Sequence, residues 1–124
     1  MSLKNKQMNV LIIDDDNTSQ RFLGAMLSRQ GYTCYYACNG YEGLRLLNES
    51  QFDVVMCDIV MPGINGYQVL AQIKRQFGNS VPVAVMSATE SKEDMIAITQ
   101  NAASLYFVKP VRMTDIRVLR SLFN

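Results

Sequence analysis

The sequence predicts an α/β fold in which five helices cover a doubly wound, five-stranded parallel sheet. Five apolar runs alternate along the chain with segments of helical periodicity. The runs are unbroken, which is typical of strands buried on both faces of a parallel sheet. With 124 residues, 48% of them hydrophobic, the chain is long enough for one domain with a sizeable core.

We expect this single domain to span residues 1–124, with residues 1–7 as a flexible start or a cloning remnant. The sequence contains no internal repeat, no low-complexity tract and no linker rich in proline or serine. The length favours a protein that acts alone, although the same sequence would also fit one unit of a longer chain.

Three strands and two helices are expected in the first half of the chain. The strands are the apolar runs Met8–Ile13, Thr33–Ala37 and Val54–Cys57. The first helix should begin at Asn17 or Thr18 and end near Gly31, which suits the residue after a helix. The second helix should be capped by Asn39 and end before Ser50.

Two strands and three helices are expected in the second half. Val83–Met86, opened by Pro82, and Leu105–Val108 are the remaining apolar runs. The third helix should bury its apolar face and end at Gly78. Ser91 and Asp94 resemble a capping box for the fourth helix. Thr114 is the expected cap of the last helix, whose buried positions would be Ile116, Leu119 and either Leu122 or Phe123.

Right-handed crossovers between parallel strands favour a flavodoxin-like sandwich with strand order 2-1-3-4-5. In such a sheet the C-terminal ends of all strands lie at one edge, and ligands bind there, near the point where the strand order reverses.

Composition excludes several classes of function. The 12 basic and 11 acidic residues give a net charge of +1, so no overall field attracts nucleic acid or an acidic membrane. No apolar run approaches the roughly 20 residues of a membrane span, and the start lacks a signal peptide, so we expect a cytoplasmic protein. We expect Cys34, Cys38 and Cys57 to be buried thiols without a role. Histidine is absent, which excludes imidazole zinc sites and Ser-His catalysis.

Four of the five apolar runs end at a charged or nucleophilic side chain. These residues are Asp14 and Asp15 after the first run, Asp58 after the third, Ser87 after the fourth and Lys109 after the fifth. Each alone is explained as well by a cap, a turn or a solvated charge. Together they would place three carboxylates, a hydroxyl and an amine at one edge of the sheet, which coincidence explains poorly.

Three neighbouring carboxylates repel one another, so a cation is expected among them. An oxygen-only donor set selects a hard cation, and Mg²⁺ fits best because it takes one or two carboxylates and a phosphoryl oxygen. Lys109 would then pair with a carboxylate at rest or with an incoming phosphoryl oxygen. A nucleophile, a metal, a cation and a hydroxyl donor are the groups that phosphoryl transfer requires.

The chain resembles a receiver domain of two-component response regulators, in its CheY-like form. The segments IIDDD, DIVMPGING, MSA and YFVKP carry the resemblance, which covers roughly Met8 to Phe123. It implies that Asp58 is the phosphoacceptor. It also implies that Asp14, Asp15, the Asp58 carboxylate and the Val60 carbonyl hold Mg²⁺.

The resemblance assigns further roles near the phosphoryl group. Ser87 would hydrogen-bond it, and Lys109 would pair with it. Tyr106 matches an aromatic switch position, although it also fits an ordinary packing residue. Ser87 and Tyr106 would thus form the switch, and the bond from Lys109 to Pro110 would be cis, with a structural role for Pro110.

Some positions depart from the common pattern of this family. Asn65 replaces an aspartate, and Ala102 and Leu105 stand where glycines are frequent, so we expect local adjustment. Val60 and Thr89 occupy positions that tune the lifetime of the phosphoryl group. The apolar Val60 side chain cannot orient a water molecule, which predicts slow or moderate self-dephosphorylation.

The implied function is that of a signalling phosphoacceptor rather than an enzyme. The phosphoryl donor would be a histidine kinase or a histidine phosphotransfer protein. Phosphorylation would alter the surface of the fourth helix, fifth strand and fifth helix, which would bind an output partner or effector domain, or form a homodimer. Direct binding to nucleic acid or membranes is not expected.

Three other functions compete with this interpretation. A haloacid dehalogenase-type hydrolase needs a second aspartate where Val60 stands. A flavin-binding protein needs an anion-binding loop where Asp14–Asp16 would repel phosphate. A receiver fold used only for docking would need none of the acidic residues.

Overall fold

A computed structural model describes residues 7–88, 96 and 105–123. Its five strands form one parallel sheet with the order β2-β1-β3-β4-β5, which confirms the predicted topology. The strands are β1 (Met8–Ile13), β2 (Tyr32–Ala37), β3 (Val54–Asp58), β4 (Val83–Ser87) and β5 (Leu105–Val108). Every residue of β3 and β4 is buried, which explains why these segments read as unbroken apolar runs.

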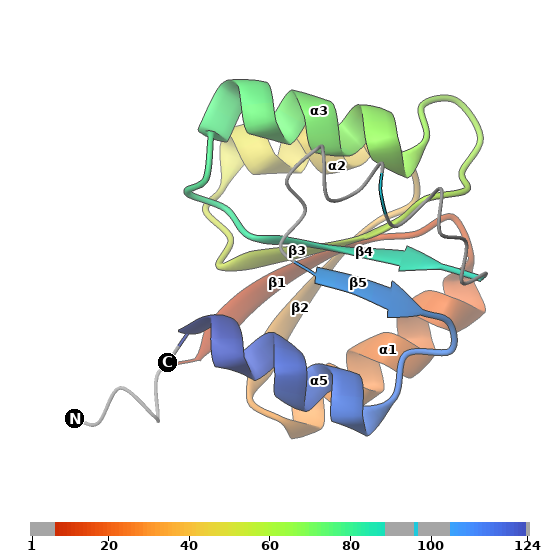
Figure 1. Cartoon of the computed structure of the whole chain (residues 1–124), viewed down its shortest axis with the longest axis vertical. Coiled ribbons are helices and arrows are strands. Elements are labelled where there is room, and N and C mark those ends of the chain that lie inside the picture. The colour runs from red at the N-terminus through yellow and green to blue at the C-terminus, as the bar shows by residue number, and fades with distance from the viewer. Residues whose placement is uncertain (1–6, 89–95, 97–104, 124) are drawn as a thin grey trace.

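Helices cover both faces of the sheet (Figure 1). On one face lie α2 (Gly40–Glu49) and α3 (Gly66–Phe77), and on the other lie α1 (Asn17–Arg29) and α5 (Met113–Arg120), which continues into the short 3-10 helix η2 (Ser121–Phe123). Apart from Ile96, the expected fourth helix, with Ser91 and Asp94, lies outside the described residues, as do Thr89 and Ala102.

Alternate strand residues divide the core between the two faces. Leu11 and Val55 belong to the cluster beneath α2 and α3, whereas Ile12 and Met56 belong to the cluster beneath α1 and α5. All four side chains are completely buried. Apolar packing on both faces therefore holds the central strands in place and fixes the positions of their C-terminal ends.

The helix boundaries near the sheet edge depend on side-chain caps. The Asn39 side chain accepts a hydrogen bond from the amide of Glu42 at 2.8 Å, as expected. Asn65 caps α3 by accepting from the amide of Gln68 at 3.0 Å, and the Gln68 side chain accepts from the amide of Asn65 at 2.8 Å. Asparagine thus replaces aspartate here without loss of the capping box.

Two local predictions were wrong. Thr114 does not cap the last helix, because α5 begins at Met113 and the Asp115 carboxylate accepts from the Arg112 amide at 2.9 Å. An acid in the first turn satisfies an unpaired amide and complements the helix dipole. Cys38 is exposed rather than buried, since it follows the edge strand β2.

The structure agrees better with the other boundaries. Strand β2 begins one residue earlier than expected, at the buried Tyr32. Cys57 is buried and Cys34 is half-buried, and both are free thiols.

None of the helices in the described ranges has the length and apolar character needed to span a bilayer.

Candidate functional site

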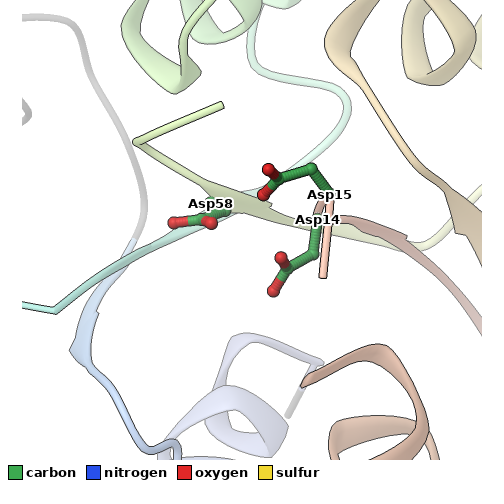
Figure 2. A group of neighbouring side chains, drawn as sticks. All are labelled: Asp14, Asp15 and Asp58. Atoms are coloured by element: carbon green, nitrogen blue, oxygen red, sulfur yellow. The ribbon is translucent and has the colours of Figure 1, made fainter. Parts of the chain in front are cut away.

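Three acidic side chains gather at the C-terminal edge of the sheet, where β1 and β3 end (Figure 2). One carboxylate oxygen from each of Asp14, Asp15 and Asp58 lies within 4.8 Å of the others. Asp14 and Asp58 are 1% and 7% exposed, whereas Asp15 is exposed to solvent. The edge of the sheet predicted from the strand ends therefore carries a compact acidic cluster.

The acidic run after β1 divides into two roles. The Asp14 amide donates to the carbonyl of Ala37 at 3.0 Å, which extends the pairing of β1 with β2. Asp16 caps α1 by accepting from the amide of Thr18 at 3.0 Å, and its own amide donates to Asp14 Oδ1 at 3.0 Å. Asp14 and Asp15 remain for the cluster, while Asp16 serves the helix.

The position of Asp58 depends on a close approach between β3 and α3. The Ile59 amide donates to the Met86 carbonyl, and the Gly66 amide donates to the Ile59 carbonyl at 2.8 Å. A Cβ atom at position 66 would lie 2.5 Å from the Asp58 carbonyl oxygen. Only glycine allows this contact, so Gly66 lets the loop after Asp58 close tightly onto the start of α3.

Lys109 joins the cluster from the end of β5. Its Nζ atom lies 2.9 Å from Asp14 Oδ2 and 3.2 Å from Asp58 Oδ2. The Lys109 amide donates to the Ser87 carbonyl at 2.7 Å, which holds the residue at the edge of the sheet. The Lys109–Pro110 peptide bond is cis, as the family resemblance implies. One ammonium group therefore balances only part of the charge of three carboxylates.

Burial and charge shift the ionisation of this cluster. Burial raises the pKa of Asp58 and Asp14 raises it further, whereas the nearby Lys109 ammonium lowers it. Burial alone would lower the pKa of Lys109, but its hydrogen bond and attraction to Asp14, together with Asp58, raise the pKa overall. The lysine therefore stays protonated, and the Asp58 carboxylate is more basic than an ordinary aspartate.

The other predicted residues lie at the same edge or just behind it. Ser87 ends β4 and is 4% exposed. Tyr106 is half-buried in β5, opposite Val85 of β4, and packs against the core beneath α2 and α3. Val60 is 74% exposed, and its backbone helps to lower the pKa of Asp58.

The donor set of the acidic cluster fits Mg²⁺. It consists of carboxylate oxygens alone, from two buried residues and one exposed residue. Hard cations prefer such oxygens, and Mg²⁺ leaves coordination positions for water and phosphoryl oxygen. The exposed Asp15 would leave one side of such an ion open to solvent.

Sequence reasoning missed one side chain that contacts the site. Gln20 of α1 is buried, and its Nε2 atom donates to the carbonyls of Asp14 at 2.7 Å and Ala37 at 3.1 Å. A glutamine in a helix is usually solvent-facing, so no sequence pattern marked it. Its contact with the site becomes apparent only from the hydrogen bonds that it makes in the folded chain.

Known proteins resemble this chain over most of its length. PilH of Pseudomonas aeruginosa is 36% identical over 103 residues, which make up 82% of this chain and 85% of PilH. Transcriptional regulatory protein AfsQ1 of Streptomyces coelicolor is 33% identical over 112 residues, which make up 89% of this chain. The chain spans 49% of the length of AfsQ1 and 27% of ZraR from Klebsiella oxytoca.

This chain also matches a solved structure and a protein family over most of its length. Response regulator TrrA of Thermotoga maritima, solved in complex with Mg²⁺-BeF, is 25% identical to this chain. The two structures match with a TM-score of 0.83 over 93% of this chain and 97% of TrrA. The response regulator receiver domain family matches residues 10–119. This protein therefore belongs to the family of response regulator receiver domains.

Proposed function

We propose that Asp58 is the residue of this receiver domain that accepts a phosphoryl group. A carboxylate oxygen of Asp58 attacks the phosphorus of a phosphohistidine donor, and an O–P bond forms as the N–P bond breaks. The imidazole nitrogen of the donor keeps the electron pair and takes up a proton. The observation that carries this proposal is the contact of Lys109 with Asp58 and Asp14 inside a cluster of three carboxylates.

The chain's own residues prepare this reaction. Asp14, Asp15, Asp58 and the Val60 carbonyl would hold Mg²⁺, which neutralises charge on the phosphoryl oxygens when bound. The similarity to TrrA, whose structure contains Mg²⁺-BeF, supports this metal. In the absence of the metal, burial raises the pKa of Asp58, and a bound cation would favour its carboxylate form.

Lys109 and Ser87 would recognise the product. Lys109 bridges two carboxylates at rest, so an acyl phosphate on Asp58 offers its ammonium a more highly charged partner. Ser87 ends the neighbouring strand and would donate its hydroxyl to a phosphoryl oxygen. Tyr106 lies one strand further along and would reorient with Ser87, which shifts the population between two states.

The donor would be a histidine kinase or a histidine phosphotransfer protein. A hollow of about 450 Å³ lies beside Lys109, with Phe22 and Leu23 of α1 and Pro110 along its wall. Phe22 is 61% exposed, so this surface offers apolar contact to a protein that approaches Asp58. The domain would act as a signalling phosphoacceptor, not as an enzyme with a separate substrate.

Output would use β5 and α5, together with the expected fourth helix outside the described residues. Phosphorylation would change the affinity of this surface for an output partner, an effector domain or a second copy of the chain. We expect the domain itself not to bind nucleic acid or membranes directly. A cytoplasmic location remains a prediction.

Acetyl phosphate and Mg²⁺ test the assignment without a protein donor. Intact-mass spectrometry should show one added phosphoryl group on the wild type, none on Asp58→Asn and one on Asp53→Asn. Asp53 is the matched control because it lies at the opposite end of β3, where it accepts from the Asn9 amide at 2.7 Å. Equal labelling of Asp58→Asn and wild type would refute the assignment. If neither the wild type nor either variant is labelled, and a titration with Mg²⁺ gives no response, the results would favour a docking module that is not phosphorylated.

A further inference from the structure

Gln20 is a buried polar residue next to the acidic cluster. It lies in the first turns of α1 and is 9% exposed. Its side-chain amide donates two hydrogen bonds, both to backbone carbonyls that lie at the C-terminal edge of the sheet: 2.7 Å to Asp14 and 3.1 Å to Ala37. One side chain therefore joins a helix to the ends of two neighbouring strands.

The bond to the Asp14 carbonyl acts on the peptide unit that links Asp14 to Asp15. Strand β1 ends at Ile13, so the sheet ladder no longer holds this unit. Its orientation fixes the direction in which the chain leaves Asp14 and hence where the Asp15 carboxylate points. The Ala37 carbonyl also accepts from the Asp14 amide at 3.0 Å. The peptide unit before Asp14 is therefore held by Ala37, and the peptide unit after it is held by Gln20, which itself binds Ala37.

We propose that Gln20 is a positioning residue for the Mg²⁺ site, and this inference rests on the proposed function. Its amide holds the Asp14–Asp15 peptide unit so that two of the three carboxylates face the third. Loss of the amide would leave two buried carbonyls without that donor and free the peptide unit to rotate. Binding of Mg²⁺ would then require the peptide unit to become ordered, which would lower the affinity for the ion.

Calorimetric titration of the metal-free protein with Mg²⁺ measures this effect directly. Gln20→Met removes both donors at nearly constant volume, and Gln30→Met makes the same substitution at an exposed position beyond the other end of α1. We expect the Kd for Mg²⁺ to rise about tenfold in Gln20→Met, because partners that orient metal ligands are typically worth about 10- to 100-fold in affinity. Gln30→Met should bind as the wild type does.

A purely structural role of Gln20 gives a different result. In that case Gln20→Met would melt earlier, but at a temperature where it is folded its Kd for Mg²⁺ would stay within about twofold of the wild type. That outcome would overturn the inference and leave the proposed function intact. If the wild type itself binds no Mg²⁺, both fail.

A second measurement serves if Gln20→Met does not fold. The side-chain amide of Gln20 in the wild type should exchange with solvent far more slowly than that of Gln30, and its NMR signals should shift on saturation with Mg²⁺. Exchange as fast as at Gln30, or signals that ignore the metal, would contradict a role in positioning the ligands.

Discussion

Lys109→Met should destabilise the metal-free protein strongly. The substitution removes an ammonium group that lies 2.9 Å from one carboxylate oxygen of Asp14 and 3.2 Å from one of Asp58. At an effective dielectric constant of about 20, each contact supplies roughly 5 kcal/mol of attraction before desolvation is subtracted. Removal of one partner of a buried ion pair typically costs about 3–5 kcal/mol.

We expect the lower end of that range, about 3 kcal/mol, because the Lys109 side chain is 23% exposed. Urea unfolding at about pH 7 without Mg²⁺ measures the loss. With an m value of about 2 kcal/mol/M, the midpoint should fall by about 1.5 M. Lys74→Met, which removes a lysine from α3, should change the midpoint much less. Addition of Mg²⁺ should bring the urea midpoint of Lys109→Met closer to that of the wild type, because the ion binds the folded acidic cluster.

The pH dependence of this deficit provides a second check. Burial raises the pKa of Asp58, and Lys109 opposes that rise, so Lys109→Met should raise the pKa further. A carboxyl with a higher pKa in the folded state stabilises that state as the pH falls from above the folded pKa to below the unfolded value of about 3.9. The deficit of Lys109→Met should therefore shrink between about pH 7 and pH 4. An unchanged urea midpoint at neutral pH, or a deficit that grows on acidification, would refute the reasoning.

Three further substitutions test the surroundings of the site. Gly66→Ala should destabilise by about 1–3 kcal/mol in urea unfolding, because its Cβ would lie 2.5 Å from the Asp58 carbonyl oxygen, and wild-type stability would contradict that close approach. Asn65→Ala should cost about 1 kcal/mol through loss of the cap on the Gln68 amide, and a cost near zero would count against the capping box. Val60→Asn should lose its phosphoryl label faster than the wild type, and faster loss from the wild type would contradict the prediction of slow or moderate self-dephosphorylation.

Sequence patterns predicted the sheet because strands that are buried on both faces consist almost entirely of apolar residues. The strands became unbroken apolar runs, and parallel topology then placed all their C-terminal ends together. The topology brings the ends of β1 and β5 to the same edge of the sheet, where Lys109 contacts Asp14 although the two residues are 95 positions apart. The fold and the main residues of the site were therefore within reach of the sequence.

Three local details could not be predicted from the sequence. Asp115 rather than Thr114 serves the start of α5, because a carboxylate in the first turn competes with a hydroxyl cap. Cys38 follows an edge strand, where residues in an apolar stretch can still face solvent. Gln20 gave no signal because the carbonyls that it binds come from other elements.

Location of the phosphoryl group at the level of single residues tests the central claim most directly. The wild type is incubated with acetyl phosphate and Mg²⁺, then reduced with borohydride, which converts an aspartyl phosphate to homoserine, and digested for mass spectrometry. We predict homoserine at Asp58 and at no other aspartate. Homoserine at Asp14 or Asp15, with Asp58 unmodified, would contradict the claim that Asp58 is the phosphoacceptor.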